Sequence, residues 1–572
     1  MTLTERAPIS QTETSPPQSP LKKNGAEPFR LPLALEILLG IAVALELAAP
    51  FFAKSYGVDG PSQLNLIGQF TNLVSRGVLL PRWVPNGVFG FGIGSFYFYP
   101  PVAFYISSIV RLVTGATDVR FLFQMTGLAA TILSFFAARP LLRALGASRY
   151  GTNLGALLYA FAPFQIAEIY SRSSISSHVG YIFVPLVWYG LVAIAGRTRL
   201  TRLQSIVVLG VSSALLALTS VPLALAMMLC IAIAGIVARR YLTRSVLADA
   251  ALAAALALAL SAFHFTAVLS ARPYAQLGDL TVSNPEYLLT DLLHGAGLPA
   301  GYHAGILYVS WALIGIVFLR SRAKLSGPER MAAQLALAVG AFIALLELPF
   351  LSRPLYAGVQ PFMLIQGSWR FYIQLVMIAI VAVAIARTPA MKRASRSIAW
   401  IWILGAIAPA LLVIFNLHVY QHATEPASDP TEYLPVYTIH VQMEGYGKFK
   451  QHSADPAALA NLEGNEHLSV QMPNPTSENV LASLSQAHRV VFHRLYWPYW
   501  KLEVNGKNIP SYPDSLGRAV AELPAGNYTA TWNLSVAPLE QAGRWISLAT
   551  LCGIVIGFAV GIARKRFSRK EA

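Results

Sequence analysis

The chain has 572 residues, of which 55% are hydrophobic and only 12% are charged, a balance far from that of soluble globular proteins. A net charge of +16 would suit nucleic acid in a soluble protein, but here Lys and Arg cluster in short connections between apolar segments. That pattern orients membrane proteins, so we exclude nucleic-acid binding and predict a polytopic membrane protein. Cys230 and Cys552 both lie in apolar segments, which excludes a disulfide framework and a thiolate metal site.

Residues 1–30 are polar and rich in Pro, Ser and Thr, which predicts a disordered cytoplasmic tail. No small-residue cleavage site follows the first apolar stretch, so we expect that stretch to be retained as an anchor. Twelve stretches are long enough to cross about 30 Å of hydrocarbon. They cover residues 31–52, 120–138, 151–168, 179–195, 203–218, 222–238, 246–268, 304–319, 331–348, 371–386, 398–417 and 545–563.

The loop at residues 53–118 follows the first span and carries an acid, Asp59, near its start. Between Pro61, which suits a helix start, and Gly77, which suits a helix end, apolar residues recur at helical spacing. We expect this helix to lie on the membrane surface. Its apolar positions are Leu66, Ile67, Phe70, Leu73 and Val74. Residues 83–99 hold too many turn formers for a span and too many aromatic rings for a solvated linker, which predicts a folded lid.

The segment at residues 100–113 is apolar but short, and counting it as a span would invert every later connection. Without it, the basic connections that follow residues 138, 195, 238, 319, 386 and 563 all fall on one side. The positive-inside rule therefore predicts that 100–113 is re-entrant or interfacial and that both termini are cytoplasmic.

Residues 418–543 differ from the long apolar stretches before them, because apolar and polar residues alternate in short runs rich in β-branched and aromatic residues. These runs include VYTIHVQM, RVVFHRLYW, WKLEVNGK, RAVAELP and NYTATWNLSV. Asn505-Gly506 is typical of a tight hairpin turn. We predict an external, all-β, sandwich-like domain. It would lie between a helical membrane domain at residues 31–417 and a last span with a basic tail at residues 544–572.

The predicted external loops carry groups that a lipid-dependent transferase needs. No pool of nucleotide-activated substrates exists outside the cytoplasm, so an outward-facing enzyme draws on a donor in the bilayer, such as a polyprenyl-phosphate sugar. Such a site needs a carboxylate to take a proton or hold a cation, basic groups for the phosphate and an apolar slot for the lipid. Asp59 is the candidate carboxylate; the alternative is a solvated acid or the cap of the following helix.

Arginine is scarce in the predicted external loops, which favours Arg172 and Arg370 as phosphate ligands. Arg272 and Arg353 lie in neighbouring loops, and snorkelling to membrane lipid headgroups is the alternative for each of the four. Trp369 suits either an interface anchor or a substrate contact. The remaining candidate substrate-binding residues are Gln63, Arg82, Tyr99 and His178.

Glu46 lies inside the first predicted span, where an ionisable group is costly and should face the bundle interior or be protonated. It suits a transporter as well as a structural hydrogen bond. The histidines, among them His178 and His264, show no metal-ligand spacing, so no zinc site is predicted.

Several stretches resemble one family. The run from Asp59 through GQFTNLVSRGVLLPRWVPNGVFGFGIGSFYFYPPVAFY resembles the first external loop of bacterial membrane proteins labelled 6-pyruvoyl-tetrahydropterin synthase-related. Those proteins are relatives of the YfhO-like proteins in the GT-C glycosyltransferase superfamily. IYSRS around Arg172, IQGSWRF around Arg370, and YWPYWKLEVNGKNIP with AELPAGNYTATW in the β-domain agree with it. The likeness spans residues 59–545, and it implies no pterin chemistry, since the histidine zinc cluster of that soluble enzyme is absent.

The resemblance implies a GT-C-like helical bundle in the bacterial inner membrane. It implies an inverting transfer from a polyprenyl-phosphate sugar to a glycan, lipid or protein acceptor. Asp59 would serve as base or as ligand of a divalent cation, Mg²⁺ or Mn²⁺, while Arg172 and Arg370 would hold the donor phosphate. The family pattern has a His at Gln63, a Glu near Ser177 and a His near Ser220, and these three departures weigh against activity.

Two other functions stay open. One is a transport or non-catalytic component of envelope polysaccharide assembly, which Glu46 in mid-span and the three departures support. The other is a scaffold that presents aromatic residues of the β-domain to a glycan or protein partner, although such residues usually form the core of a small sandwich. These aromatic residues are Tyr496, Trp497, Tyr499, Trp500 and Trp532.

Overall fold

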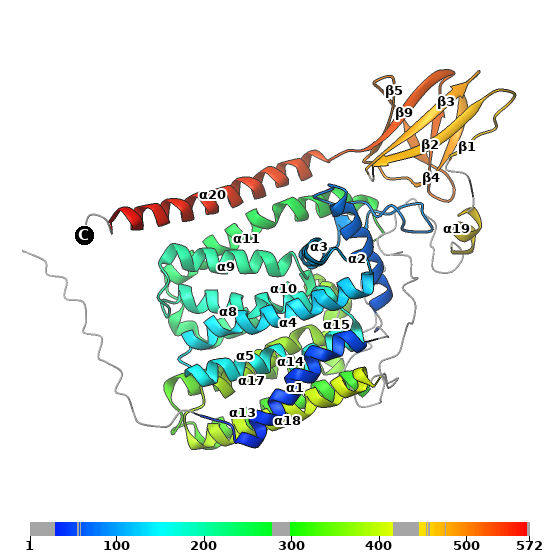
Figure 1. Cartoon of the computed structure of the whole chain (residues 1–572). Coiled ribbons are helices and arrows are strands. Elements are labelled where there is room, and N and C mark those ends of the chain that lie inside the picture. The colour runs from blue at the N-terminus through cyan, green and yellow to red at the C-terminus, as the bar shows by residue number, and fades with distance from the viewer. Residues whose placement is uncertain are drawn as a thin grey trace, which may run out of the picture.

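The computed structural model describes residues 29–53, 57, 59–276, 298–365, 367–415, 446–453, 455, 458–474 and 476–568. Helices that run roughly alongside one another make up most of it, and two β-sheets lie beyond one end of the bundle (Figure 1). The chain is therefore mainly helical, with a β-region near its C-terminus, as predicted.

Each of the twelve predicted spans overlaps a helix, because the apolar stretches have good helix formers and few internal breakers. The matching helices are α1 (Leu33–Phe52), α4 (Val119–Ala144), α5 (Arg149–Ala160), α8 (Phe183–Ile194), α9 (Arg202–Ala217), α10 (Val221–Val237), α11 (Arg244–Ala271), α13 (Leu298–Ser321), α14 (Gly327–Leu346), α17 (Tyr372–Ala384), α18 (Pro389–Ile414) and α20 (Pro538–Ser568).

Among the described residues, eight helices are long and apolar enough to cross a membrane. They are α1, α4, the joined α7 (Ile175–Gly180) and α8, α11, α13, α14, α18 and α20. The other four predicted spans coincide with α5, α9, α10 and α17, the longest of which has 17 residues and a length of about 26 Å. A multi-pass membrane protein is supported, and the count of twelve crossings stays a prediction.

The predicted span at 151–168 is not one continuous helix. Helix α5 ends at Ala160, and a five-residue helix, α6 (Pro163–Ala167), starts with Pro163 in its first turn. Proline has no backbone N–H to continue the ladder of α5, which explains the break. A π-helical turn, η2 (Glu168–Arg172), follows at once. This broken passage carries two charged residues of the site described below.

The loop after α1 contains the predicted amphipathic helix, α2 (Gly60–Ser75), with Pro61 in its first turn. Gly77 has a φ of +87°, the left-handed conformation that ends a helix. The apolar face packs inward, with Leu66 and Ile67 fully buried. The short apolar segment that follows forms α3 (Val102–Thr114), whose 13 residues give about 20 Å, less than a full crossing.

The aromatic lid at residues 83–99 folds back on itself through an antiparallel bridge between Val84 and Ile93. It contacts the β-region directly, since the Phe91 ring stacks on His493 at 3.9 Å and the Leu495 N–H donates to the Phe91 carbonyl. The lid is therefore a packing surface between the helices and the sheets.

The β-region is a pair of antiparallel sheets, which agrees with the predicted sandwich. One has the order β1 (Ala458–Leu459), β4 (His488–Leu495), β8 (Arg518–Leu523) and β7 (Ser511–Pro513). The other has the order β2 (His467–Asn474), β3 (Ser477–Leu484), β9 (Gly526–Leu534), β5 (Trp500–Val504) and β6 (Lys507–Ile509). Asn505 and Gly506 have φ values of +51° and +75° between β5 and β6, so the predicted tight turn is confirmed. The predicted run VYTIHVQM lies outside the described residues.

Trp497, Trp500 and Trp532 are each at most 2% exposed, so these three aromatic side chains belong to a core. The indole rings of Trp497 and Trp500 also lie 6.2 and 5.8 Å from that of Trp83 in the lid. Their burial favours the core interpretation over a sugar-stacking surface.

The remaining short elements lie in the connections. They are η1 (Ser95–Tyr97), η3 (Arg239–Tyr241), η4 (Arg272–Tyr274), α15 (Pro349–Gly358), α16 (Gln360–Ile365), η6 (Ser368–Phe371) and α19 (Tyr446–His452).

Connections predicted on the same side of the membrane contact one another. At the predicted cytoplasmic end, the Tyr150 hydroxyl donates to Glu36 at 2.7 Å, and the Arg387 N–H donates to Glu329 at 2.7 Å. At the other end the lid meets the sheets, and α20 runs from the sheets alongside α11 toward the opposite end (Figure 1). The two ends are consistent with the predicted topology, while their assignment to cytoplasm and exterior stays a prediction.

Candidate functional site

Asp59 and Arg172 form an ion pair where the loop after α1 meets the π-helical turn η2. The Arg172 Nη2 atom lies 2.9 Å from Asp59 Oδ2, and the Asp59 N–H donates to the Arg172 carbonyl at 2.9 Å. Asp59 precedes α2 at the capping position, but its side chain makes no cap hydrogen bond. The Asp59 side chain therefore does not cap α2, which was the alternative role for this acid.

Glu168 is the second carboxylate on Arg172, and it was not singled out from the sequence. Both of its oxygens lie 3.2 Å from Arg172 Nη1, and the residue is 3% exposed. Glu168 lies four residues before Arg172, which is the usual spacing of an ion pair on a helix. This spacing is the feature of the sequence that indicates the pair. In a chain with so few acids, that spacing would have been enough to find it.

The backbone around this pair is unusual. The π-helical turn η2 is a rare element that is frequent at functional sites. Ser173 directly after it has a φ of +59°, in the left-handed region that a non-glycine residue rarely adopts. Its hydroxyl accepts the Gly57 N–H at 2.7 Å, so the strained residue ties the turn to the loop before Asp59. Strain of this kind is common where a side chain must be held for function.

Trp369 and Arg370, on η6, complete the group. The Arg172 and Arg370 guanidinium carbons lie 5.5 and 6.0 Å from the centroid of the Trp369 ring, both within cation–π range. Gly367 makes this arrangement possible, because a Cβ atom there would lie 1.7 Å from the Trp369 ring. We call Asp59, Glu168, Arg172, Trp369 and Arg370 the charged cluster.

Arg370 also donates to the Ser177 hydroxyl at 2.8 Å. The partner of Arg370 in this contact is thus a neutral hydroxyl oxygen. The Arg172 guanidinium contacts two acids, Asp59 at 2.9 Å and Glu168 at 3.2 Å.

The electrostatics of the two arginines differ. Burial opposes the charge of Arg172, but the carboxylates of Glu168 and Asp59 outweigh it and raise the pKa of its guanidinium. For Arg370, which precedes the predicted span at 371–386, burial and the charge of Arg172 lower the pKa to about 10. Arg370 is thus cationic at neutral pH in surroundings that disfavour its charge, and a bound anion would relieve that.

The other predicted site residues lie elsewhere. Gln63 sits one turn into α2 from Asp59 and is 7% exposed. His178 is buried against α4, where its Nε2 atom lies 3.0 Å from Thr131 Oγ1. Tyr99 packs its ring against Phe104 at 6.2 Å within the lid. Of these three, Gln63 meets the charged cluster through its backbone, because its N–H donates to the Asp59 carbonyl at 3.0 Å.

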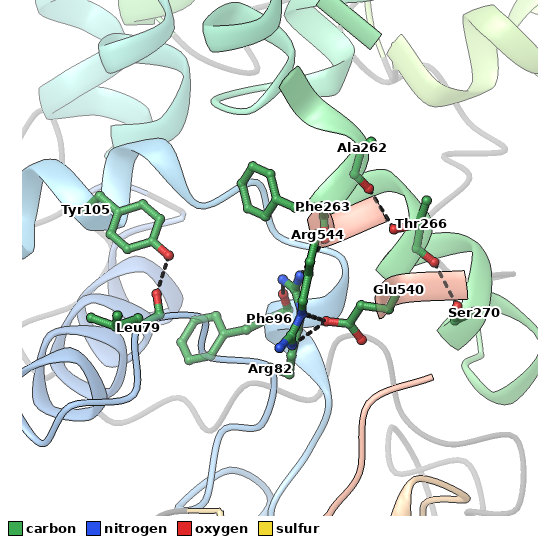
Figure 2. A network of polar contacts seen from close by, with 10 residues as sticks. All are labelled: Leu79, Arg82, Phe96, Tyr105, Ala262, Phe263, Thr266, Ser270, Glu540 and Arg544. Carbon is green, nitrogen blue, oxygen red and sulfur yellow. Dashed lines mark hydrogen bonds and ion pairs between the residues drawn. The ribbon is translucent and has the colours of Figure 1, made fainter. Parts of the chain in front are cut away.

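Arg82 belongs to a separate buried network (Figure 2). Its Nε atom lies 2.8 Å from Glu540 at the start of α20, and its Nη2 atom donates to the Phe263 carbonyl of α11 at 2.8 Å. Arg544 binds the same Glu540 oxygen at 2.7 Å. The predicted substrate contact for Arg82 is replaced by a structural role, because its guanidinium fastens the lid to α11 and α20.

The charged cluster is a poor fit for the divalent cation that the resemblance implies. Its two carboxylates, Asp59 and Glu168, are both directed at Arg172, whose charge competes with a metal ion. In the described part of the chain, no group of three His, Cys, Asp or Glu side chains is placed to hold a metal. We therefore derive no catalytic step through a metal ion.

No known protein family matches the sequence, and no curated protein is similar to it. Solved structures do match. The arabinofuranosyltransferase AftD from Mycobacteria has 17% identity and a TM-score of 0.43, over 70% of this chain and 28% of AftD. ArnT from Cupriavidus metallidurans, bound to undecaprenyl phosphate, has 10% identity and a TM-score of 0.40, over 68% of this chain and 77% of ArnT.

The oligosaccharyltransferase from Archaeoglobus fulgidus, in its apo form, has 14% identity and a TM-score of 0.41, over 69% of this chain and 57% of the archaeal one. Two of these three proteins are sugar transferases by name, and the third was solved with a polyprenyl phosphate. This chain spans about a quarter of the length of AftD. The narrower resemblance to the 6-pyruvoyl-tetrahydropterin synthase-related proteins stays a prediction.

Proposed function

We propose that the protein is a membrane glycosyltransferase of the GT-C type, which transfers a sugar from a polyprenyl-phosphate donor to an envelope glycan, lipid or protein. The observation that carries the proposal is the charged cluster. Three predicted external loops, far apart in the sequence, supply Asp59, Arg172 and Arg370: Asp59 pairs with Arg172, and both arginines lie over one indole ring. A carboxylate beside two arginines is what a donor phosphate and an acceptor hydroxyl require.

The reaction would be a single displacement. The oxygen of the acceptor hydroxyl forms a bond to the anomeric carbon of the sugar, and the bond from that carbon to the phosphate oxygen breaks. The hydroxyl proton passes to the Asp59 carboxylate, which is 37% exposed and so within reach of an acceptor. The electron pair of the broken bond stays on the polyprenyl phosphate. Attack from the face opposite the leaving group inverts the anomeric centre.

Arg172 and Arg370 would serve the leaving phosphate. Arg370, whose guanidinium also donates to the Ser177 hydroxyl at 2.8 Å, would supply one positive charge beside the phosphate. Arg172 orients Asp59 and adds a second guanidinium on the same indole ring. Planar guanidinium groups bind phosphate oxygens in pairs, and this lowers the barrier as negative charge develops on the leaving group.

The proposed location follows from the predicted topology. The charged cluster would lie at the outer surface of a bacterial inner membrane, the β-region would be periplasmic or extracytoplasmic, and both termini would be cytoplasmic. The lid contacts the β-region through Phe91 and Trp83, so the lid and the sheets would lie on the same side of the membrane.

The first test measures binding of undecaprenyl phosphate to the full-length protein in nanodiscs, by native mass spectrometry and by thermal stabilisation. We expect the wild type to bind it, and undecaprenol without phosphate to bind at least tenfold more weakly. Arg370→Gln should weaken phosphate-lipid binding at least tenfold, because one charge-assisted contact is lost.

Arg353→Gln is the matched control. Arg353 is an exposed arginine on α15, in the loop that leads to Arg370, so its removal changes the net charge equally. Unchanged binding by Arg370→Gln, or equal loss in Arg353→Gln, would show that the lipid phosphate is not held by the charged cluster.

A non-catalytic role in envelope glycan assembly is the second candidate. It is favoured by the double contact of Arg172 with Asp59 and Glu168, since an acceptor hydroxyl would have to compete with the guanidinium for the Asp59 carboxylate. One assay distinguishes the transferase function from the non-catalytic role. The non-catalytic role would be favoured if the protein binds undecaprenyl phosphate but releases no polyprenyl phosphate from any labelled polyprenyl-phosphate sugar.

A further inference from the structure

A pocket lies beside the π-helical turn η2 and is lined by residues of this turn that are not in the charged cluster. It has an empty volume of about 580 Å³, including the space at its mouth. Ile169 and Tyr170 of the turn line it, whereas Glu168 and Arg172 of the same turn belong to the charged cluster. Glu46, Gln165 and His178 are among its polar lining residues, which also include Gln124, Thr131 and Tyr170. We call it the Glu46 pocket.

The side chains of Glu46, Gln165 and His178 are each more than nine-tenths buried, and each keeps a polar atom without a partner among the described residues. Glu46 is 6% exposed, Gln165 is 0% and His178 is 2%. The atoms concerned are Glu46 Oε1, Gln165 Oε1 and His178 Nδ1. Buried polar atoms without a partner are rare and costly, so each calls for an explanation.

All three atoms are hydrogen-bond acceptors. We assign the ring proton of His178 to Nε2, which lies 3.2 Å from the Gly127 carbonyl, an acceptor, and 3.0 Å from the Thr131 hydroxyl, which itself donates to that carbonyl. In the neutral ring, Nδ1 is then a bare acceptor. Gln165 already uses its amide nitrogen to donate to the Tyr159 carbonyl at 2.7 Å, which leaves its oxygen as the open group. The third atom is a carboxyl oxygen of Glu46.

A pocket with three open acceptors calls for an occupant that supplies donors and positive charge. A primary ammonium has three N–H donors, the same number as the open acceptors, and an ionised Glu46 would balance its charge. We propose that the Glu46 pocket binds a primary ammonium group, held by Glu46, Gln165 and His178. The site is distinct from the proposed transferase site, and the inference does not rest on that function.

A metal ion fits this pocket less well. Sodium, magnesium and calcium prefer oxygen ligands, and an imidazole nitrogen is a poor match for them. Metals that accept imidazole need more side-chain ligands, and no group of three His, Cys, Asp or Glu occurs in the part of the chain that the structure describes. A single ammonium group needs only the three acceptors that are present.

The walls of the pocket indicate what the ammonium would be attached to. Phe123, Leu128, Phe161 and Ile166 are apolar lining residues. Glu46 lies six residues before the end of α1 at Phe52, or about 9 Å along the helix. An amine on a short apolar stem therefore suits both the depth and the walls.

The test uses the full-length protein in nanodiscs of phosphatidylcholine and phosphatidylglycerol, which contain no primary amine. The probes are n-butylammonium, butyltrimethylammonium and n-butanol, with binding measured by calorimetry and by thermal stabilisation. We expect n-butylammonium to bind at least tenfold more tightly than butyltrimethylammonium, because the methylated cation has the charge without the N–H donors. This comparison needs no variant and so does not depend on the folding of one.

Glu46→Gln should weaken n-butylammonium binding at least tenfold, since it removes the counter-charge and keeps the shape. Glu36→Gln is the matched control, because Glu36 is an exposed carboxylate on the same helix and contacts Tyr150 away from the pocket. Equal binding of the trimethylated cation, unchanged binding by Glu46→Gln, or equal stabilisation by sodium chloride would each overturn the proposal.

One further variant tests an internal occupant. Lys54 carries a primary ammonium and is next in sequence to Ala53, which lines the pocket. Binding of n-butylammonium by Lys54→Gln but not by the wild type would overturn the proposal of an external amine. Equal binding by both proteins supports it.

Discussion

Arg172 holds Asp59 twice, through its side chain and through its backbone. The guanidinium lies 2.9 Å from the Asp59 carboxylate, and the Arg172 carbonyl accepts the Asp59 N–H, also at 2.9 Å. The residues are 113 positions apart in the sequence, and the second bond does not depend on the charge of either side chain. The position of residue 59 can therefore survive a change in its side chain.

The first prediction concerns Asp59→Asn. We expect a loss of 10²- to 10⁴-fold in sugar transfer, the usual effect of removing a general base. Stability should fall by no more than about 1 kcal/mol, because a partly exposed ion pair contributes little and the backbone bond remains. Release of undecaprenyl phosphate from labelled donors measures the first effect, and thermal unfolding in detergent measures the second.

Asp118→Asn is the control for this variant. Asp118 is another acid in the same predicted loop, and its side chain caps α4 by accepting the Arg120 N–H at 2.9 Å. Asn also caps helices well, so this change should leave both activity and stability near the wild-type values. Full turnover by Asp59→Asn would remove the carboxylate from the mechanism.

The second prediction concerns Gly367→Ala. An added Cβ atom would overlap the Trp369 ring, so the indole must move away from both guanidinium groups. Loss of the cation–π contacts should weaken undecaprenyl phosphate binding by about tenfold. The backbone itself is not strained by alanine, because the φ of Gly367 is 173°, which any residue adopts.

Gly358→Ala is a close control, since nothing lies within 4 Å of a Cβ atom at that nearby position. It should bind the lipid as the wild type does. If Gly367→Ala also binds normally, the Trp369 ring is not needed to hold the two arginines.

Local patterns in the sequence predicted the parts of the fold that local physics decides. Pro61 and Gly77 bracket α2, and Asn505-Gly506 forms the turn between β5 and β6. Each of these depends on the conformational preference of one or two residues. The break before Pro163 follows the same rule, and it was missed because the apolar run around it looked continuous.

The partners of charged residues were harder to predict, because they are set by contacts across the chain. Arg172 and Arg370 were candidates as scarce external arginines and through the family resemblance, but their shared indole ring became visible only in three dimensions. Arg82 was expected to bind substrate, but its partner Glu540 lies 458 residues away. Glu168 was not singled out either, although its four-residue spacing from Arg172 is a local pattern that the sequence shows.

The third prediction separates core from sugar-binding roles in the β-region. Trp532 is 1% exposed and meets Phe492 edge to face at 5.2 Å. Trp532→Ala should destabilise the β-region by about 3 to 5 kcal/mol, the usual cost of removing a buried tryptophan. Limited proteolysis of the full-length protein, with thermal unfolding, would detect this loss.

Tyr512→Ala is the comparison variant, because Tyr512 is a large aromatic side chain that is 40% exposed on β7. It should change stability by less than about 1 kcal/mol. A stable Trp532→Ala protein with a lost glycan interaction would instead favour the scaffold that presents aromatic residues.

The fourth prediction ranks three variants of the network that fastens the lid to the last helix (Figure 2). Glu540→Gln leaves Arg82 and Arg544 without their shared carboxylate, and Arg82 is 5% exposed. We expect this variant to lose about 3 to 5 kcal/mol. Arg82→Gln should lose less, because Glu540 keeps Arg544, and Arg544→Gln should lose least, because that side chain is 27% exposed.

Thermal unfolding gives the order, and protease cleavage within residues 83–99 reports release of the lid. A double variant, Arg82→Met with Glu540→Leu, removes both buried charges and should be more stable than Glu540→Gln alone, because no buried arginine is left without an acid. If Arg82→Gln proves as damaging as Glu540→Gln, the carbonyls of Phe96 and Phe263, which accept from Arg82, carry more of the stability than the ion pair.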